Sequence, residues 1–287
     1  MSKPMAAELP EMPGPDGDRR PSRRTASVAD VRRWGQPPGL KERRNEEHWA
    51  GRLYMRDLSP YVAWLALRTG FSPNQLTYLM MACGIAAGVV VSLPFSGTGA
   101  LWTALGGALL VQLYLLLDCV DGEVARYLRQ TSVAGVFLDR IGHYLSEVSL
   151  LIGLGLAAQG GWTSGGYTEL GLLAALGAAL IKAETDNVVV ARAKSGLPAD
   201  PAGGERALRP RSTGMALARQ AASMLRFHRI IGAVELSLLI AAAAVLDVLL
   251  GTDTPAAMRV LTVAVAAVAV VQTVLHLVSI LASRRLR

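Results

Sequence analysis

The residues best suited to chemistry lie between Asp118 and His143, inside an otherwise apolar part of this 287-residue chain. Asp118 and Asp121 are three residues apart, and Asp139 and His143 are four apart, so each pair shares one face if its segment is helical. Acidic groups are costly in sequence apolar enough to lie in a membrane, and by default they mark a functional site. These four side chains are therefore candidates for one polar site.

The spacing predicts that these side chains meet. A turn is expected near Gln130, between two apolar segments. Asp121 and Asp139 each lie nine residues from that point, and Asp118 and His143 lie twelve and thirteen residues away. In an antiparallel helix pair these positions fall at similar depths, about 14 to 20 Å from the turn at about 1.5 Å per residue. Three carboxylates so close together repel one another unless a cation joins them, and Mg²⁺ or Mn²⁺ suits such oxygen ligands.

Two further residues of the segment fit a phosphate ligand. Gly122 has no side chain, so a substrate can approach the backbone next to the carboxylate of Asp121. Arg126 lies one helical turn beyond Gly122, and its guanidinium can hold a phosphate through two hydrogen bonds. The segment therefore combines a predicted metal site with groups that bind phosphate.

The segment resembles the signature of the CDP-alcohol phosphatidyltransferases, which reads D-x2-D-G-x2-A-R-x8-G-x3-D-x3-D. Seven of the eight fixed positions match at the correct spacing over 26 residues, namely Asp118, Asp121, Gly122, Ala125, Arg126, Gly135 and Asp139. His143 stands where the family has its fourth Asp. The resemblance implies that Asp118, Asp121 and Asp139 bind one or two Mg²⁺ or Mn²⁺ ions with the pyrophosphate of a CDP-linked donor. It also implies that Gly122, Ala125 and Arg126 contact that donor.

The role of His143 is open at this point. In the family, the fourth Asp binds metal and is the candidate base for the acceptor hydroxyl. The resemblance therefore implies that His143 binds metal and is a catalytic residue. Asp139 and Arg126 are the other two catalytic residues that it implies. A neutral imidazole, which titrates near pH 6.5, suits a base but is a poorer Mg²⁺ ligand than a carboxylate. Glu147, one turn beyond His143, is an alternative replacement for the missing acid. An ordinary interhelical hydrogen bond explains Glu147 equally well.

Two more pairs of residues are expected to contact substrate. Residues 73–77 resemble the P-N-x-x-T element that opens the first membrane helix of the family, which places Asn74 and Thr77 near the nucleotide. A plain helix start, with Ser72 as cap, explains the same residues. Arg226 and Arg229 are expected to hold a phosphate of the acceptor alcohol, although arginines that extend toward the membrane interface would look the same.

Membrane helices are the elements that must position these residues. The chain is 52% hydrophobic but only 6% aromatic, which is too apolar for an ordinary soluble domain and typical of packed membrane helices. We expect an all-α integral membrane protein with a disordered cytoplasmic tail at 1–45, an interfacial amphipathic helix at 46–70 and a six-helix membrane domain at 71–287. The six expected spans are 73–93, 98–129, 131–158, 168–196, 229–250 and 256–283.

The distribution of basic residues predicts the orientation. With six spans, both termini lie on one side, and the three loops on the other side are 94–97, 159–167 and 251–255. None of these loops contains Lys or Arg, and of the 29 basic residues only Arg259 falls near that side. The positive-inside rule therefore places both termini and the predicted site on the cytoplasmic side of the cell membrane.

The resemblance thus implies a multi-pass enzyme of phospholipid synthesis that transfers a substituted phosphate from a CDP-linked lipid to an acceptor alcohol, which in some members of the family is itself phosphorylated, with release of CMP. The alternatives are a non-catalytic relative that binds CDP-lipid or metal, and an ion transporter, which would explain neither Gly122 nor Arg126. We expect membrane lipids as partners, a homodimer as a possible assembly, and no nucleic acid.

Overall fold

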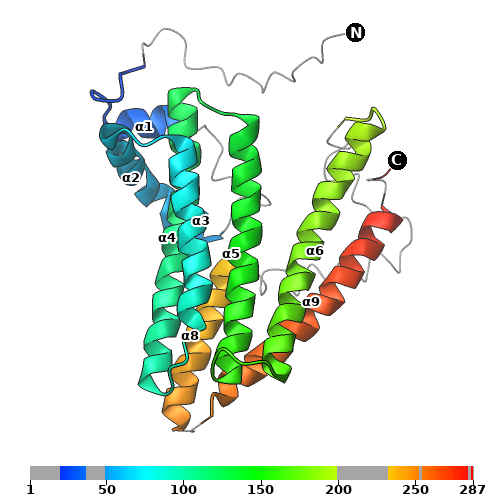
Figure 1. Cartoon of the computed structure of the whole chain (residues 1–287). Coiled ribbons are helices and arrows are strands. Elements are labelled where there is room, and N and C mark those ends of the chain that lie inside the picture. Colours follow the sequence, from blue (N-terminus) through cyan, green and yellow to red (C-terminus); the bar gives the residue numbers. More distant parts are fainter. Residues whose placement is uncertain (1–19, 37–48, 199–231, 252–253, 284–285, 287) are drawn as a thin grey trace. The chain divides into compact units, whose positions relative to one another are not determined.

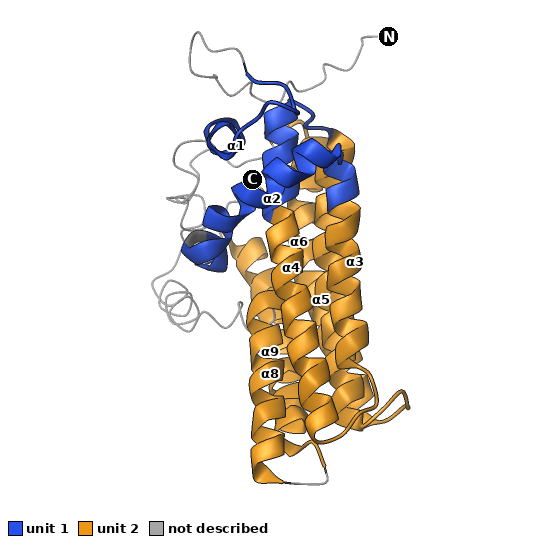
Figure 2. Cartoon of the chain, turned by 90° about the vertical axis from the view of Figure 1, so that its left-hand side faces the viewer, with its two compact units in different colours: residues 1–76, 119–132 blue, residues 77–118, 133–287 orange. Residues whose placement is uncertain are grey.

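The computed structural model describes residues 20–36, 49–198, 232–251, 254–283 and 286, and over these residues all the regular elements are helices. Figure 1 labels the helices in chain order, and Figure 2 colours the two compact units into which the chain divides. Unit 1 comprises 1–76 and 119–132, and unit 2 comprises 77–118 and 133–287. Both units include parts of α3 (Pro73–Val91) and α4 (Thr98–Leu128).

Unit 1 contains a short helix that the sequence analysis missed. Helix α1 (Val28–Gly35) lies within the segment expected to be a disordered tail, so that expectation is wrong for these residues. The signal was a capping box: the backbone N–H of Asp30 bonds to Oγ of Ser27, and the Asp30 carboxylate accepts from the N–H of Ser27. The hydroxyl and N–H of Ser27 also hold the pKa of the Asp30 carboxyl below its usual range.

The segment around α1 is held by the end of α4. The hydroxyl of Tyr127 donates to the carbonyl of Pro21 at 2.8 Å, and Nε of Arg126 donates to the carbonyl of Gly35 at 2.6 Å. Val31 of α1 is fully buried. These contacts order the polar segment around α1, and they come from residues about a hundred positions further along the chain.

The remaining helices of unit 1 follow the expected pattern more closely. A π-helical turn, η1 (Gly51–Met55), continues directly into α2 (Arg56–Thr69), which ends at Gly70 in the left-handed conformation. These helices cover most of the expected interfacial segment at 46–70. Helix α3 begins at Pro73, and Ser72 and Gln75 exchange backbone and side-chain hydrogen bonds across its first turn, as the helix-start interpretation predicts.

Unit 2 holds most of the long apolar helices. After α4 come α5 (Val133–Gln159), α6 (Gly166–Lys194), α8 (Ala233–Leu250) and α9 (Ala256–Ala282). Helix α5 packs against α6, α8 and α9, and α9 also packs against α6 and α8. The turn expected near Gln130 lies between α4 and α5, where Arg129 adopts a left-handed conformation with a φ of 54°.

Small residues allow the helices of unit 2 to approach one another closely. A Cβ atom added at Gly153 of α5 would lie 2.3 Å from the carbonyl oxygen of Gly88 of α3. No side chain fits there, so backbone meets backbone at this crossing. Contacts of this type are how helices associate in lipid, where there is no hydrophobic driving force between them.

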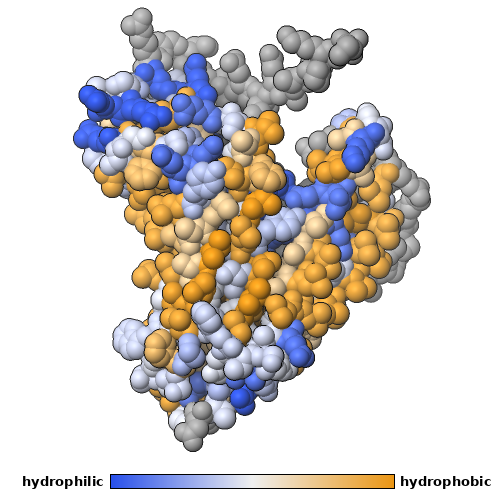
Figure 3. All heavy atoms as spheres, in the orientation of Figure 1, coloured by the Kyte–Doolittle hydropathy of each residue, from blue (hydrophilic) through white to orange (hydrophobic). Residues whose placement is uncertain are grey.

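Five helices in the described residues are long and apolar enough to cross a membrane: α3, α4, α5, α8 and α9. The fourth expected span, 168–196, corresponds to α6, which has 29 residues but carries Glu169, Lys182, Glu184 and Asp186 along its length. Apolar atoms cover much of the sides of the long helices in Figure 3. Exposed leucines on α6, including Leu172 and Leu176, contribute to this apolar surface. The protein is therefore an all-α membrane protein with at least five candidate spans.

Candidate metal centre

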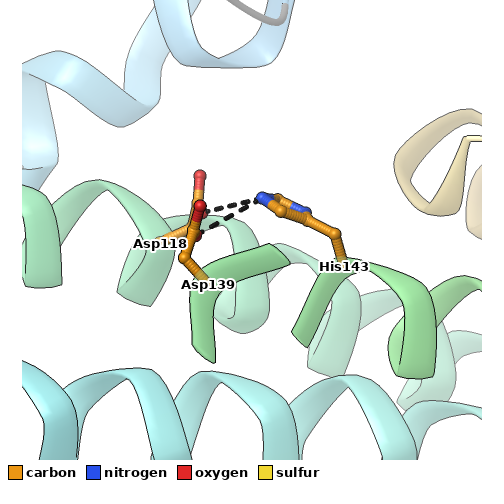
Figure 4. A group of neighbouring side chains, drawn as sticks. All are labelled: Asp118, Asp139 and His143. Carbon is orange, nitrogen blue, oxygen red and sulfur yellow. Dashed lines mark ion pairs between the residues drawn. The ribbon is translucent and has the colours of Figure 1, made fainter. Parts of the chain in front are cut away.

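Asp118, Asp139 and His143 lie together in unit 2. Each offers one ligand atom, and these three atoms lie within 4.8 Å of one another. Nε2 of His143 lies 3.3 Å from Oδ1 of Asp118 and 3.5 Å from Oδ1 of Asp139 (Figure 4). Asp118 comes from α4, and the other two come from successive turns of one face of α5.

This donor set fits a divalent cation. Two carboxylates that share a site repel each other unless a proton or a cation joins them. Their oxygens suit Mg²⁺ and Mn²⁺, and an imidazole nitrogen is more compatible with Mn²⁺ than with Mg²⁺. The side chains of Asp118, Asp139 and His143 are 23%, 42% and 34% exposed, respectively. The centre is therefore open to a ligand from outside.

Asp121 is not part of this group of ligand atoms. It lies one helical turn beyond Asp118 on α4 and is buried, with 8% of its surface exposed. The sequence analysis paired Asp121 with Asp139 by their equal distance from the turn, whereas Asp118 approaches both Asp139 and His143. The role of Asp121 as a metal ligand stays a prediction.

The sequence analysis missed Tyr114, which contacts the other nitrogen of the histidine. Its hydroxyl is hydrogen-bonded to Nδ1 of His143, and the two rings meet edge to face with their centroids 5.7 Å apart. Tyr114 lies one turn before Asp118 on α4 and is 3% exposed. The signal available in the sequence was this i, i+4 spacing from Asp118, but an aromatic residue in an apolar run resembles ordinary core.

Glu147 has a different partner. Its carboxylate forms an ion pair with Lys182 of α6, with Oε1 and Nζ 3.2 Å apart. Further along α6, Asp186 is paired with Arg140 and accepts a hydrogen bond from Tyr144, and Glu184 lies 2.7 Å from Nδ1 of His276. In unit 2, these acidic residues of α5 and α6 therefore serve as counter-ions and hydrogen-bond acceptors between helices.

The predicted phosphate-binding residues lie on the part of α4 that belongs to unit 1. The guanidinium of Arg126 lies over Gly122, since Nη1 is 3.0 Å from the position that a Cβ there would take. Ala125 precedes it on the same helix and is partly buried. A side chain at residue 122 would thus be in tight contact with the Arg126 guanidinium in its present position, which is one physical reason for a glycine here.

Glu123 is a second buried group that sequence reasoning left as a plain helix residue. Its side chain is fully buried, and Oε1 accepts hydrogen bonds from Ser59 at 2.5 Å and Gln36 at 2.8 Å. Arg56 lies 3.5 Å from the same oxygen. Glu123 therefore connects α4 with α2 and with the residue that follows α1.

For the remaining predicted site residues, the structure gives position and burial at most. Asn74 lies in the first turn of α3 and is partly buried, and Thr77 is buried one turn later. Their proximity to a nucleotide is untested. Arg226 and Arg229, expected to hold an acceptor phosphate, lie outside the residues that the structure describes.

Comparison with known protein families identifies the family to which the chain belongs. The family model described as CDP-alcohol phosphatidyltransferase matches residues 71–283, which is most of the chain. The chain belongs to this family. The match includes both helices that supply Asp118, Asp139 and His143, so the metal centre falls within the family domain and the resemblance of the signature is confirmed at the level of the family.

Individual relatives of this phosphatidyltransferase family match over shorter stretches. The chain is 34% identical over 113 residues to a phosphatidylinositol phosphate synthase of Streptomyces avermitilis, which covers 39% of the chain and 43% of that protein. It is 31% identical over 144 residues to one of Mycolicibacterium smegmatis, covering 50% of the chain and 60% of the relative. A Gallus gallus cholinephosphotransferase 1 is 31% identical over 116 residues, covering 38% and 35%. The matched stretches thus span between 35% and 60% of the length of these relatives.

Proposed function

We propose that this protein transfers a substituted phosphate group from a CDP-linked lipid donor to the hydroxyl of an acceptor alcohol, with release of CMP, in phospholipid synthesis. The observation that carries the proposal is the convergence of Asp118, Asp139 and His143, which occupy positions of the family signature. Membership of the family supplies the class of reaction.

Asp118, Asp139 and His143 would hold one Mg²⁺ or Mn²⁺ ion, with Asp121 as a further ligand to it or to a second ion. When bound there, such an ion would supply positive charge that offsets the charge of the donor pyrophosphate and makes its phosphorus more electrophilic. The protein supplies metal ligands at fixed positions, so little reorganisation of the site is needed when charge develops in the transition state. His143 is assigned primarily as a ligand, because its Nε2 faces both carboxylates.

Arg126 would bind the donor phosphate and stabilise the negative charge on departing CMP. Its guanidinium keeps the planar fork that a phosphate requires, and Gly122 leaves room beside it. Ala125, Asn74 and Thr77 complete the proposed donor contacts. The acceptor hydroxyl must lose its proton when it attacks the phosphorus of the donor. If His143 is not bound to metal, it would accept this proton as a general base.

The acceptor is proposed to be a phosphorylated alcohol. Three relatives carry the name phosphatidylinositol phosphate synthase, which supports a phosphate on the acceptor side. Arg226 and Arg229 are the proposed contacts for that phosphate. A homodimer is the proposed assembly.

The proposed topology has six spans, in which α6 is the fourth, and an interfacial helix formed by η1 and α2. The absence of Lys and Arg from 94–97, 159–167 and 251–255 supports cytoplasmic termini and a site that faces the cytoplasm. Polar residues on α6 find partners on α5 and α9, which lowers the cost of placing that helix in the membrane. The proposed location is the cell membrane.

A second candidate is a non-catalytic protein that binds CDP-lipid or metal, favoured by one observation: His143 replaces the fourth acid of the family. The two candidates are separated by incubating the purified protein in detergent with CDP-diacylglycerol, Mg²⁺ or Mn²⁺ and a panel of acceptor alcohols. CMP release and mass spectrometry of a new lipid product would support the enzyme. Binding of CDP-diacylglycerol without release of CMP in the presence of any acceptor would support the binding protein.

A further inference from the structure

We infer that Tyr114 is a positioning residue that fixes the ring of His143 so that its Nε2 lone pair faces the metal centre. The inference rests on the proposed metal centre and adds a residue that lies outside the family signature. It starts from one contact, the hydrogen bond between the Tyr114 hydroxyl and Nδ1 of His143.

The two nitrogens of the imidazole have different surroundings. Nε2 faces Oδ1 of Asp118 and Oδ1 of Asp139, at 3.3 and 3.5 Å. Nδ1 faces the hydroxyl of Tyr114, whose ring packs edge to face against the imidazole. The ring of His143 is thus held from both ends, with its two nitrogens pointing to opposite sides.

A phenolic hydroxyl suits Nδ1 because it both donates and accepts hydrogen bonds. Without a cation, the carboxylates accept a hydrogen bond from Nε2–H, and Nδ1 accepts one from the tyrosine. When Nε2 binds a cation, the proton of the neutral ring must reside on Nδ1, and the same tyrosine oxygen accepts it. A metal-bound histidine almost always donates its other N–H to such a partner, which orients the ring and raises its affinity for the metal.

Packing holds this partner in place. Tyr114 is 3% exposed, so its ring and hydroxyl are fixed beside His143, whose own side chain is 34% exposed. Removal of the hydroxyl would leave Nδ1–H without its acceptor, and that cost falls on the form of the ring that binds metal. Tyr114 also lies one turn before Asp118 on α4, so one helix face supplies both a metal ligand and the group that orients another.

The test measures Mn²⁺ binding to the purified full chain in detergent by electron paramagnetic resonance, without any turnover. Tyr114→Phe keeps the ring and removes only the hydroxyl. We expect Mn²⁺ affinity to fall about 10- to 100-fold and the ¹⁴N modulation of bound Mn²⁺ to weaken. Tyr144→Phe is the matched control, because its hydroxyl bonds to Asp186 and not to His143; its Mn²⁺ affinity should match that of the wild type.

A second background separates positioning from packing. In His143→Asp there is no imidazole to orient, so adding Tyr114→Phe should change Mn²⁺ affinity less than about twofold. Equal losses in both backgrounds, or no loss in either, would overturn the inference while leaving the metal centre intact. Wild-type protein that binds no Mn²⁺ would instead overturn the metal centre, and the inference with it.

Discussion

Nε of Arg126 donates a hydrogen bond to the carbonyl of Gly35, 2.6 Å away, and so links the end of α1 to the arginine of the family signature. A third residue adds to this relationship, because a Cβ at Gly35 would lie 3.1 Å from the carbonyl oxygen of Glu123. Within unit 1, the segment before the membrane helices is thus in contact with a proposed donor-binding residue.

Arg126→Lys should weaken use of the CDP-linked donor. Lysine keeps the charge, but it lacks the Nε–H that bonds to Gly35 and the planar fork that holds a phosphate. We expect the KM for CDP-diacylglycerol to rise about tenfold or more, which corresponds to the loss of about 1.4 kcal/mol of binding. Arg129→Lys, in the turn that follows α4, is the control and should leave the KM unchanged. An unaltered KM in Arg126→Lys would mean that Arg126 has only a structural role.

Glu123→Ala should destabilise the protein. The substitution removes the acceptor for Ser59 and Gln36 and leaves Arg56 without the carboxylate 3.5 Å away. Removal of one member of a buried charged pair costs on the order of 3 kcal/mol. Thermal unfolding in detergent should therefore occur several degrees lower than in the wild type. Glu169→Ala, at an exposed position of α6, should leave the unfolding temperature unchanged; an equal shift in both variants would refute a special role for Glu123.

The long helices could be predicted from sequence because their apolar runs are long enough to cross a membrane. The predicted ends agree with α3, α4 and α5 to within a few residues. Helix α1 could not be predicted in the same way, since its polar segment is stabilised by contacts with Arg126 and Tyr127, far away in the chain. Composition alone does not encode such contacts.

The sequence predicted four converging side chains, of which the structure brings Asp118, Asp139 and His143 together and leaves Asp121 outside the group, and their pairing was not predictable. Spacing identified Asp118, Asp139 and His143, since i, i+3 and i, i+4 relations follow from the helix period alone. Which carboxylate approaches the imidazole depends on how far one helix is shifted along the other and on side-chain rotamers, which spacing does not determine. Tyr114 was missed for the same reason: its hydroxyl has a partner only in the folded structure.

His143→Asp should shift the metal preference of the enzyme. The substitution restores the fourth acid of the family and replaces a nitrogen ligand by an oxygen ligand, which suits Mg²⁺ better. We expect the variant to stay active and the ratio of CMP release with Mg²⁺ to that with Mn²⁺ to rise several-fold. His143→Ala, which offers no ligand, should lose turnover with both ions. A metal preference unchanged in His143→Asp would show that residue 143 does not contact the ion.

Glu147→Gln distinguishes the two residues, His143 and Glu147, that are proposed to take the place of the family's fourth acid. Glu147 is paired with Lys182 across 3.2 Å, so the variant should lose an ion pair but keep the metal dependence of turnover. The metal concentration that gives half-maximal CMP release should change less than about twofold. A variant that is folded but inactive at saturating Mg²⁺ or Mn²⁺ would instead assign the role of the fourth acid to Glu147.

The central claim is that transfer depends on a metal ion held by Asp118, Asp139 and His143. Its most direct test is CMP release as a function of Mg²⁺ and Mn²⁺ concentration in the wild type and in Asp139→Asn, with Asp57→Asn on α2 as control. Asparagine preserves shape and removes charge, so turnover should fall about 10³-fold while the protein still folds, since a catalytic metal ion contributes several kcal/mol. Near-normal turnover of Asp139→Asn at saturating metal would contradict the claim.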